Sequence, residues 1–185
     1  PVEQAARRLK ANDLAGAESD LSEALRSAPN DPVAHNVLGL VRLEQRRYPE
    51  AIEEFSTAIR LRVPFPEALI NLAVACNRTG EHELAIKVCD LALAAAPGNV
   101  PALLNRGMAC KGLRRLGDAK QAFEQAGNHP MARFNLGHTL LLENDLERGL
   151  PLCEARREVF RTGDGLAGGP WRGEAGDGRT LLVLS

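Results

Sequence analysis

Apolar residues recur every three or four positions along most of this chain, the spacing that places them on one face of an α-helix. Stretches rich in Pro, Gly and Asn interrupt this spacing at residues 29–32, 64–66, 97–99 and 127–130, and such stretches end helices. The pattern predicts helices that follow one another in pairs. The pairs cover residues 2–11 and 13–27, 32–45 and 48–61, 66–79 and 82–95, 100–113 and 116–126, and 130–142 and 146–160.

The helix pairs are copies of one repeat. The dipeptides Leu38-Gly39, Leu72-Ala73 and Arg106-Gly107 are spaced by 34 residues, and Leu136-Gly137 follows after 30. A small residue comes thirteen positions after each dipeptide begins, and a Phe or Cys four positions later: Ala51 and Phe55, Ala85 and Cys89, Ala119 and Phe123, Gly149 and Cys153. The small residues let two helix backbones approach closely, and the larger ones fill the remaining space. Because the fourth copy lacks four residues near Gly127, we expect its second helix to be short.

This pattern resembles the tetratricopeptide repeat, in which two antiparallel helices form a unit of 34 residues. The resemblance covers residues 1–160 and divides them into repeats at about 1–29, 30–63, 64–97, 98–129 and 130–160. It implies an all-α, right-handed superhelical solenoid. The first helix of each repeat is expected to line the concave face.

The sixth residue of the predicted first helix is Asn71, Asn105 and Asn135 in the last three repeats, and Asn36 lies beside this position in the second. An Asn side chain both donates and accepts, so it can bind a peptide backbone without reading side chains. Repeats about 10 Å apart would meet roughly every third residue of an extended peptide. The resemblance supports this ladder, because the repeat part of protein O-linked sugar transferases uses one. The alternative is that these Asn side chains hold neighbouring helices together.

Further positions on the same helices complete the predicted groove: Leu40, Val74, Met108 and His138, then Asn77 and Lys111. These residues make the groove mildly apolar and nearly neutral. It lacks the Lys, Asn and Arg set with which chaperone-binding relatives grip a C-terminal carboxylate, so we do not expect that function. His138 is interpreted as an ordinary surface histidine.

Composition narrows the function further. The chain has 185 residues, of which 44% are hydrophobic and 4% aromatic, and its net charge is −1. This balance argues against a nucleic-acid partner, and the basic pairs at helix ends, such as Arg46-Arg47, are expected to be solvated. No apolar run approaches the roughly 20 residues that span a bilayer. We therefore expect no membrane insertion and a cytoplasmic location.

Candidate chemistry is sparse. The four cysteines form no CxxC pair and have no His at zinc-ligand spacing, and the repeat register places each of them in the core. We therefore expect buried thiols in a reducing compartment and no metal site. No phosphate loop, catalytic triad or carboxylate pair stands in a suitable setting. The chain is expected to have no cofactor, no catalytic residue and no enzymatic activity of its own.

The composition changes after Phe160. Seven of the 17 glycines lie between residues 163 and 178, so residues 161–178 are predicted to be a linker, and residues 179–185 to be the first strand of a truncated α/β domain. Residues 147–156, 170–174 and 178–183 resemble the junction of bacterial proteins in which tetratricopeptide repeats precede a glycosyltransferase-like domain. The family's glycine-rich sugar-nucleotide segment is absent here. The single Trp, Trp171, is expected to cover the apolar face of helix 146–160.

Two functions follow from these features. The first is a protein-interaction module that binds an extended peptide or a partner helix in its groove, as the substrate-recruiting part of a larger glycosyltransferase-like protein. The second is an assembly scaffold whose repeats stack end to end. Self-association through the terminal repeats or the C-terminal strand is left open.

Overall fold

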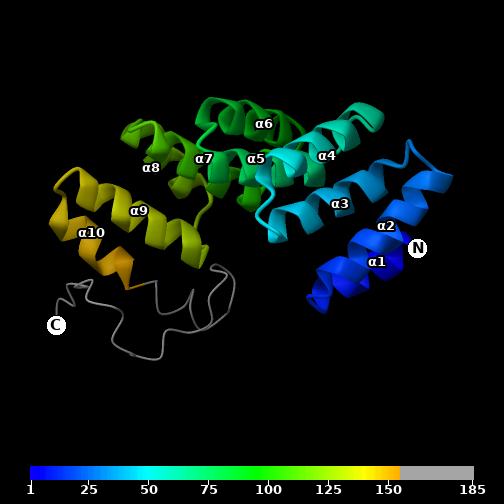
Figure 1. Ribbon diagram of the computed structural model, residues 1–185. Helices are drawn as coiled ribbons and strands as arrows, with labels where there is room; N and C mark the ends of the chain where they lie inside the picture. The colour runs from blue at the N-terminus through cyan, green and yellow to red at the C-terminus, as the bar shows by residue number, and fades with distance from the viewer. Residues whose placement is uncertain (155–185) are drawn as a thin grey trace, which may run out of the picture.

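The computed structural model describes residues 1–154, and this part of the chain is entirely helical apart from turns. Its ten helices form five consecutive pairs (Figure 1). Their bounds are α1 Val2–Lys10, α2 Leu14–Ser27, α3 Pro32–Glu44, α4 Tyr48–Leu61, α5 Pro66–Thr79, α6 His82–Ala95, α7 Val100–Gly112, α8 Leu116–Gln125, α9 Pro130–Leu142 and α10 Leu146–Cys153. Figure 1 shows the pairs following one another in chain order, from α1 and α2 at the N-terminal end to α9 and α10 at the other.

The predicted helices are confirmed, most of them to within one residue at either end. The second helix of the fourth repeat, α8, is short as predicted, with 10 residues against 14 in α2, α4 and α6. The last helix begins at Leu146 as predicted and extends to Cys153. The predicted linker, the predicted strand and Trp171 lie outside the described residues.

Local sequence signals explain where the helices begin. Pro occupies the first or second position of each first helix after α1, where its missing N–H costs nothing. Asp31 and Asn99 cap α3 and α7, each accepting a hydrogen bond from a backbone N–H of the first turn. Within each pair the chain turns through one residue in the left-handed region. These residues are Asn12, Arg46, Gly80, Arg114 and Asn144, at the same position of each repeat.

Close packing inside each repeat depends on the small residues that the sequence singled out. A Cβ added to Gly39 would lie 2.5 Å from Cε1 of Phe55, and one added to Gly107 would lie 2.4 Å from Cε1 of Phe123. Both rings are fully buried, so each glycine provides the space that a phenyl ring occupies. In the last pair the approach is between backbones, because a Cβ on Gly137 would lie 2.8 Å from the carbonyl oxygen of Gly149.

The repeats stack through their first helices. First helices contact one another from α1 to α3, α5, α7 and α9 in turn, and the second helices α2, α4, α6 and α8 each pack between two first helices. In a curved row of helix pairs, the layer whose members touch one another lies on the inner side. The first helices therefore form the concave surface, as the family resemblance implies.

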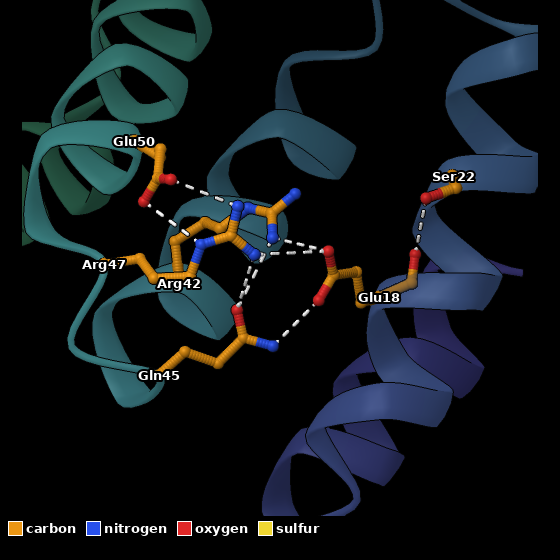
Figure 2. Close-up of polar contacts among 6 residues, drawn as sticks. All are labelled: Glu18, Ser22, Arg42, Gln45, Arg47 and Glu50. Carbon is orange, nitrogen blue, oxygen red and sulfur yellow. Dashed lines mark hydrogen bonds and ion pairs between the residues drawn. The ribbon is translucent and has the colours of Figure 1, made fainter.

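Polar contacts reinforce the junction between the first two repeats (Figure 2). Glu18 on α2 accepts hydrogen bonds from Arg42 on α3 and from Nε2 of Gln45, the latter at 2.8 Å. Arg47 lies 3.5 Å from the same carboxylate and also pairs with Glu50. The hydrogen bond from Gln45, together with the guanidiniums of Arg42 and Arg47, holds the pKa of Glu18 below its usual value.

Candidate functional site

The candidate site is the concave surface formed by α3, α5, α7 and α9. One row consists of residues at the same position of four consecutive first helices: Leu40, Val74, Met108 and His138. Leu40 and Val74 are half-buried, whereas Met108 is 41% exposed and His138 is also exposed. The row therefore combines two half-buried apolar side chains with an exposed Met and an exposed His.

The predicted asparagines lie between neighbouring helices and contact the adjacent repeats. Nδ2 of Asn71 donates to Oδ1 of Asn36 at 3.0 Å, which connects α5 to α3. Nδ2 of Asn77 donates to the backbone carbonyl of Asn105 at 3.0 Å, which connects α5 to α7. Asn36 is 9% exposed, so its amide depends on this neighbour for a hydrogen-bond partner. These side chains thus bridge consecutive first helices, which was the alternative interpretation of the ladder.

The third bridge of this kind involves a charge. Nζ of Lys111 on α7 donates to Oδ1 of Asn135 on α9 at 3.0 Å. Asn135 is 5% exposed, and its Nδ2 donates to the carbonyl of Met131 at 2.8 Å. That second bond fixes the amide so that its oxygen faces the lysine.

Some hydrogen-bonding capacity remains for a ligand. Among the described residues no hydrogen bond reaches Oδ1 of Asn71, and this side chain is half-buried rather than enclosed. Lys111 uses one of its three N–H donors on Asn135. The surface can therefore offer both an acceptor and donors beside its apolar row.

The electrostatics of the surface centre on Lys111. Burial lowers the pKa of Lys111, because a charged ammonium is poorly solvated there. Partial burial of the ring lowers the pKa of His138, and the positive charge of Lys111 lowers it further. At neutral pH the imidazole of His138 is therefore uncharged, and Lys111 carries the positive charge of this part of the groove.

The cysteines offer little chemistry. Cys76, Cys89 and Cys110 are fully buried, as predicted. Burial raises the pKa of Cys76 to about 11 and that of Cys89 to about 12, so both thiols stay protonated at neutral pH. Cys153 differs from the prediction because it is half-buried, at the last turn of α10.

The described part of the chain offers neither a cluster of metal ligands nor a helix that could span a membrane. Within residues 1–154, no three His, Cys, Asp or Glu side chains are placed to hold a metal ion together. None of the helices in that range is long and apolar enough to cross a bilayer.

Two histidines that the sequence analysis did not single out hold helices together. Nδ1 of His35 on α3 lies 2.6 Å from Oε2 of Glu54 on α4. Nδ1 of His82 lies 3.3 Å from Oδ1 of Asn77, and a Cβ added to Gly112 would lie 2.3 Å from Nε2 of His82. The sequence signal for the contact between His82 and Gly112 was the glycine itself, which lies in the last turn of α7 although no helix cap requires a glycine there.

Comparison with protein families identifies the repeat. A family model described as a tetratricopeptide repeat matches residues 2–62 and 38–100. A second tetratricopeptide repeat model matches residues 100–126. No curated protein sequence matches the chain.

Solved structures share the arrangement of the helices. MamA from Desulfovibrio magneticus RS-1 (residues 41 to the end) is 21% identical, over 88% of this chain and 94% of that one, with a TM-score of 0.76. YrrB, described as a TPR protein with an unusual peptide-binding site, is 21% identical over 85% and 84% of the two chains, with a TM-score of 0.68. At this identity the likeness shows the fold alone.

Proposed function

The chain belongs to the tetratricopeptide repeat family, and from this premise we propose that its concave surface binds an extended peptide or a helix of a partner protein. The observation that carries the proposal is the row of Leu40, Val74, Met108 and His138 across four consecutive first helices. An apolar side chain as exposed as Met108 becomes favourable to bury when a ligand covers it. The peptide-binding site named for YrrB supports a similar use of this fold.

Substitutions of the bridging asparagines are poor tests of the proposed binding. Replacing Asn71 or Asn135 removes a contact between repeats as well as a groove amide. A loss of binding in such a variant would not distinguish a lost ligand contact from a distorted groove. A better variant is Met108→Asp, because this side chain is exposed and its replacement leaves the core intact.

The experiment selects binders from a displayed library of short random peptides and measures the affinity of the resynthesised peptides by fluorescence anisotropy. Met108→Asp is expected to weaken binding by about ten-fold or more, because it places a charge on the apolar row. The matched control is Leu91→Asp on α6, whose side chain is 61% exposed on a second helix, outside the row. Equal affinities of the two variants, or a library that yields no binder, would contradict the proposal.

A scaffold that self-associates is the second candidate. It is favoured by the exposed apolar face of α10, on which Leu146 is 54% exposed and Leu150 is 45% exposed. If stacking of repeats is the function, light scattering should show a mass that rises with protein concentration. Leu146→Asp combined with Leu150→Asp should then restore the monomer, whereas Met108→Asp should not.

We also propose that this module recruits protein substrates for a glycosyltransferase-like domain of a longer parent, and that the chain acts by binding rather than by catalysis. The support is the resemblance of residues 147–156, 170–174 and 178–183 to such junctions. The parent protein tests it. Its sugar transfer to a groove-binding protein should fall with Met108→Asp, while transfer to a free short acceptor should not change.

A further inference from the structure

The apolar face of α10 is less covered than the equivalent faces of the earlier second helices. Leu150 is 45% exposed, whereas Ile86, at the same position of α6, is 8% exposed. Cys153 is half-buried, whereas its equivalents in the earlier repeats are at most 1% exposed: Leu21, Phe55, Cys89 and Phe123. Leu146 is exposed, whereas its equivalents are half-buried: Leu14, Tyr48, His82 and Leu116. Within the described residues, the last repeat therefore lacks a cover that the others have.

The cover of the earlier faces is the first helix of the next repeat. Helices α3, α5, α7 and α9 pack against α2, α4, α6 and α8 respectively, whereas α10 is the last described helix of the row (Figure 1). Leu146 and Leu150 lie one turn apart on one side of α10, so together they form a single apolar surface. Burying such side chains away from water is favourable. The end of the row is thus a site for an apolar group.

The sequence that follows α10 contains a residue suited to this face. Residues 155–185 lie outside the described residues and include the single Trp of the chain, Trp171. An indole ring brings about 150–250 Å² of surface in one rigid group, enough to contact two leucines one turn apart. Its N–H needs an acceptor when the ring is buried. The exposed carboxylate of Glu154, one turn after Leu150, can accept that hydrogen bond.

Covalent attachment favours this residue over a group from another molecule. Trp171 follows the last residue of α10 by 18 positions, and a chain of that length can span up to about 60 Å. The helix itself is only about 12 Å long, so its whole face is within reach. A tethered group acts at an effective concentration of the order of mM, whereas a second copy of the chain competes only at its own concentration.

We infer that Trp171 folds back onto α10 and covers Leu146 and Leu150, in the place that the first helix of a next repeat would take. The contact closes the apolar row at its C-terminal end without a further helix pair. It also covers the surface through which a second copy could stack, so this inference and the self-associating scaffold assign different occupants to the same face. The proposed peptide groove does not depend on it, because that groove is formed by first helices.

Fluorescence tests the inference directly, because all tryptophan emission of the chain comes from Trp171. The folded 185-residue chain should emit at a shorter wavelength than the same chain unfolded in urea, and acrylamide should quench it less. Leu146→Asp combined with Leu150→Asp should return the emission to the unfolded value, because charges then lie beneath the ring. The matched control is Leu84→Asp combined with Leu91→Asp, two exposed leucines of α6. It should keep the wild-type emission, with circular dichroism showing both variants folded.

Light scattering on the same samples distinguishes the tethered segment from a second copy. A wavelength shift that persists at every concentration at which the mass is that of the monomer would support the inference. A shift that disappears as dilution brings the mass down to the monomer would assign the face to a second copy and overturn it. Folded and unfolded chains with the same emission would overturn it as well. So would a shift that survives the α10 substitutions, or one that the α6 substitutions also remove.

Discussion

The second, third and fourth repeats match the volumes of two residues at the crossing of their helices. Gly39 faces the ring of Phe55, and Gly107 faces the ring of Phe123. The third repeat has Ala73 and Cys89 at the equivalent positions, so a larger first residue is combined with a smaller second one. A close-packed interior has no spare volume, and this inverse relation is what such packing requires.

The match predicts the outcome of Gly39→Ala. The new Cβ would lie 2.5 Å from the Phe55 ring, and overpacking of this kind costs about 1–3 kcal/mol. We expect a net loss of stability in urea unfolding, although Ala is the better helix former by about 1 kcal/mol. The control is Gly117→Ala on α8, where no atom lies within 4 Å of the new Cβ and stability should not fall.

A second variant distinguishes crowding from other causes. Phe55→Cys should cost less in the Gly39→Ala background than in the wild type, because the pair then reproduces Ala73 and Cys89. The coupling should be about 1 kcal/mol, as is usual for residues in contact. Strictly additive effects would contradict the explanation by volume.

The sequence predicted which residues are buried, because helix geometry determines burial. It did not predict which hydrogen-bond partner a polar side chain has when several are within reach. The spacing of Gly, Ala and Phe fixed which positions are buried, and Phe55 and Phe123 are buried as predicted. The partner of Asn71 could not be predicted in this way. An Asn amide can bind either a neighbouring helix or a ligand. Which of the two it binds depends on the distance between repeats, and the spacing of residues in the sequence does not give that distance.

At the scale of elements, the junctions between repeats differ in their polar chemistry. The junction between the first two repeats contains a partly buried ionic network around Glu18. Later junctions include amide bridges such as the one between Asn36 and Asn71. The ionic junction depends on pH, whereas the amide junctions do not. The helices themselves were predictable because caps, prolines and period all agree. The residues that join one pair to the next are far apart in sequence, and their pairing was not predicted.

The ionic junction predicts how stability responds to acid. Because the folded-state pKa of Glu18 is lowered, its contribution is present above the unfolded-state pKa, about 4.3, and is lost as pH falls through the folded-state value. Glu18→Gln should therefore cost about 1 kcal/mol at neutral pH, a modest value because the pair is partly exposed. The difference from the wild type should shrink below about pH 4.

Urea unfolding across this pH range measures the effect. The matched control is Glu53→Gln, an exposed residue of α4, which should track the wild type throughout. A Glu18→Gln deficit that stays constant down to acid pH would mean that the charge of Glu18 does not stabilise the junction.

At the scale of the whole molecule, stability is spread along a row of units rather than gathered around one centre. The core divides into several clusters, one of which joins α1, α2 and α3 and another of which extends from α4 to α8. Each helix pair contacts its neighbours in the row, so the free energy of unfolding is close to a sum of local terms. The family resemblance predicted this architecture, because tetratricopeptide repeats stack into a row of helix pairs.

Gly137→Ala tests whether damage stays local. The new Cβ would lie 2.8 Å from the carbonyl oxygen of Gly149 and 2.9 Å from the backbone nitrogen of Cys153. Backbone atoms yield less easily than a flexible side chain, so α9 and α10 must separate, at a cost of about 2 kcal/mol. In a row of nearest-neighbour units this loss should raise amide hydrogen exchange in α9 and α10 and leave α3 and α4 protected as in the wild type.

Gly39→Ala should produce the opposite gradient, with faster exchange at α3 and α4 and unchanged exchange at α9 and α10. Equal loss of protection along the chain in both variants would mean that the repeats unfold as one cooperative unit, and the additive description would then be wrong.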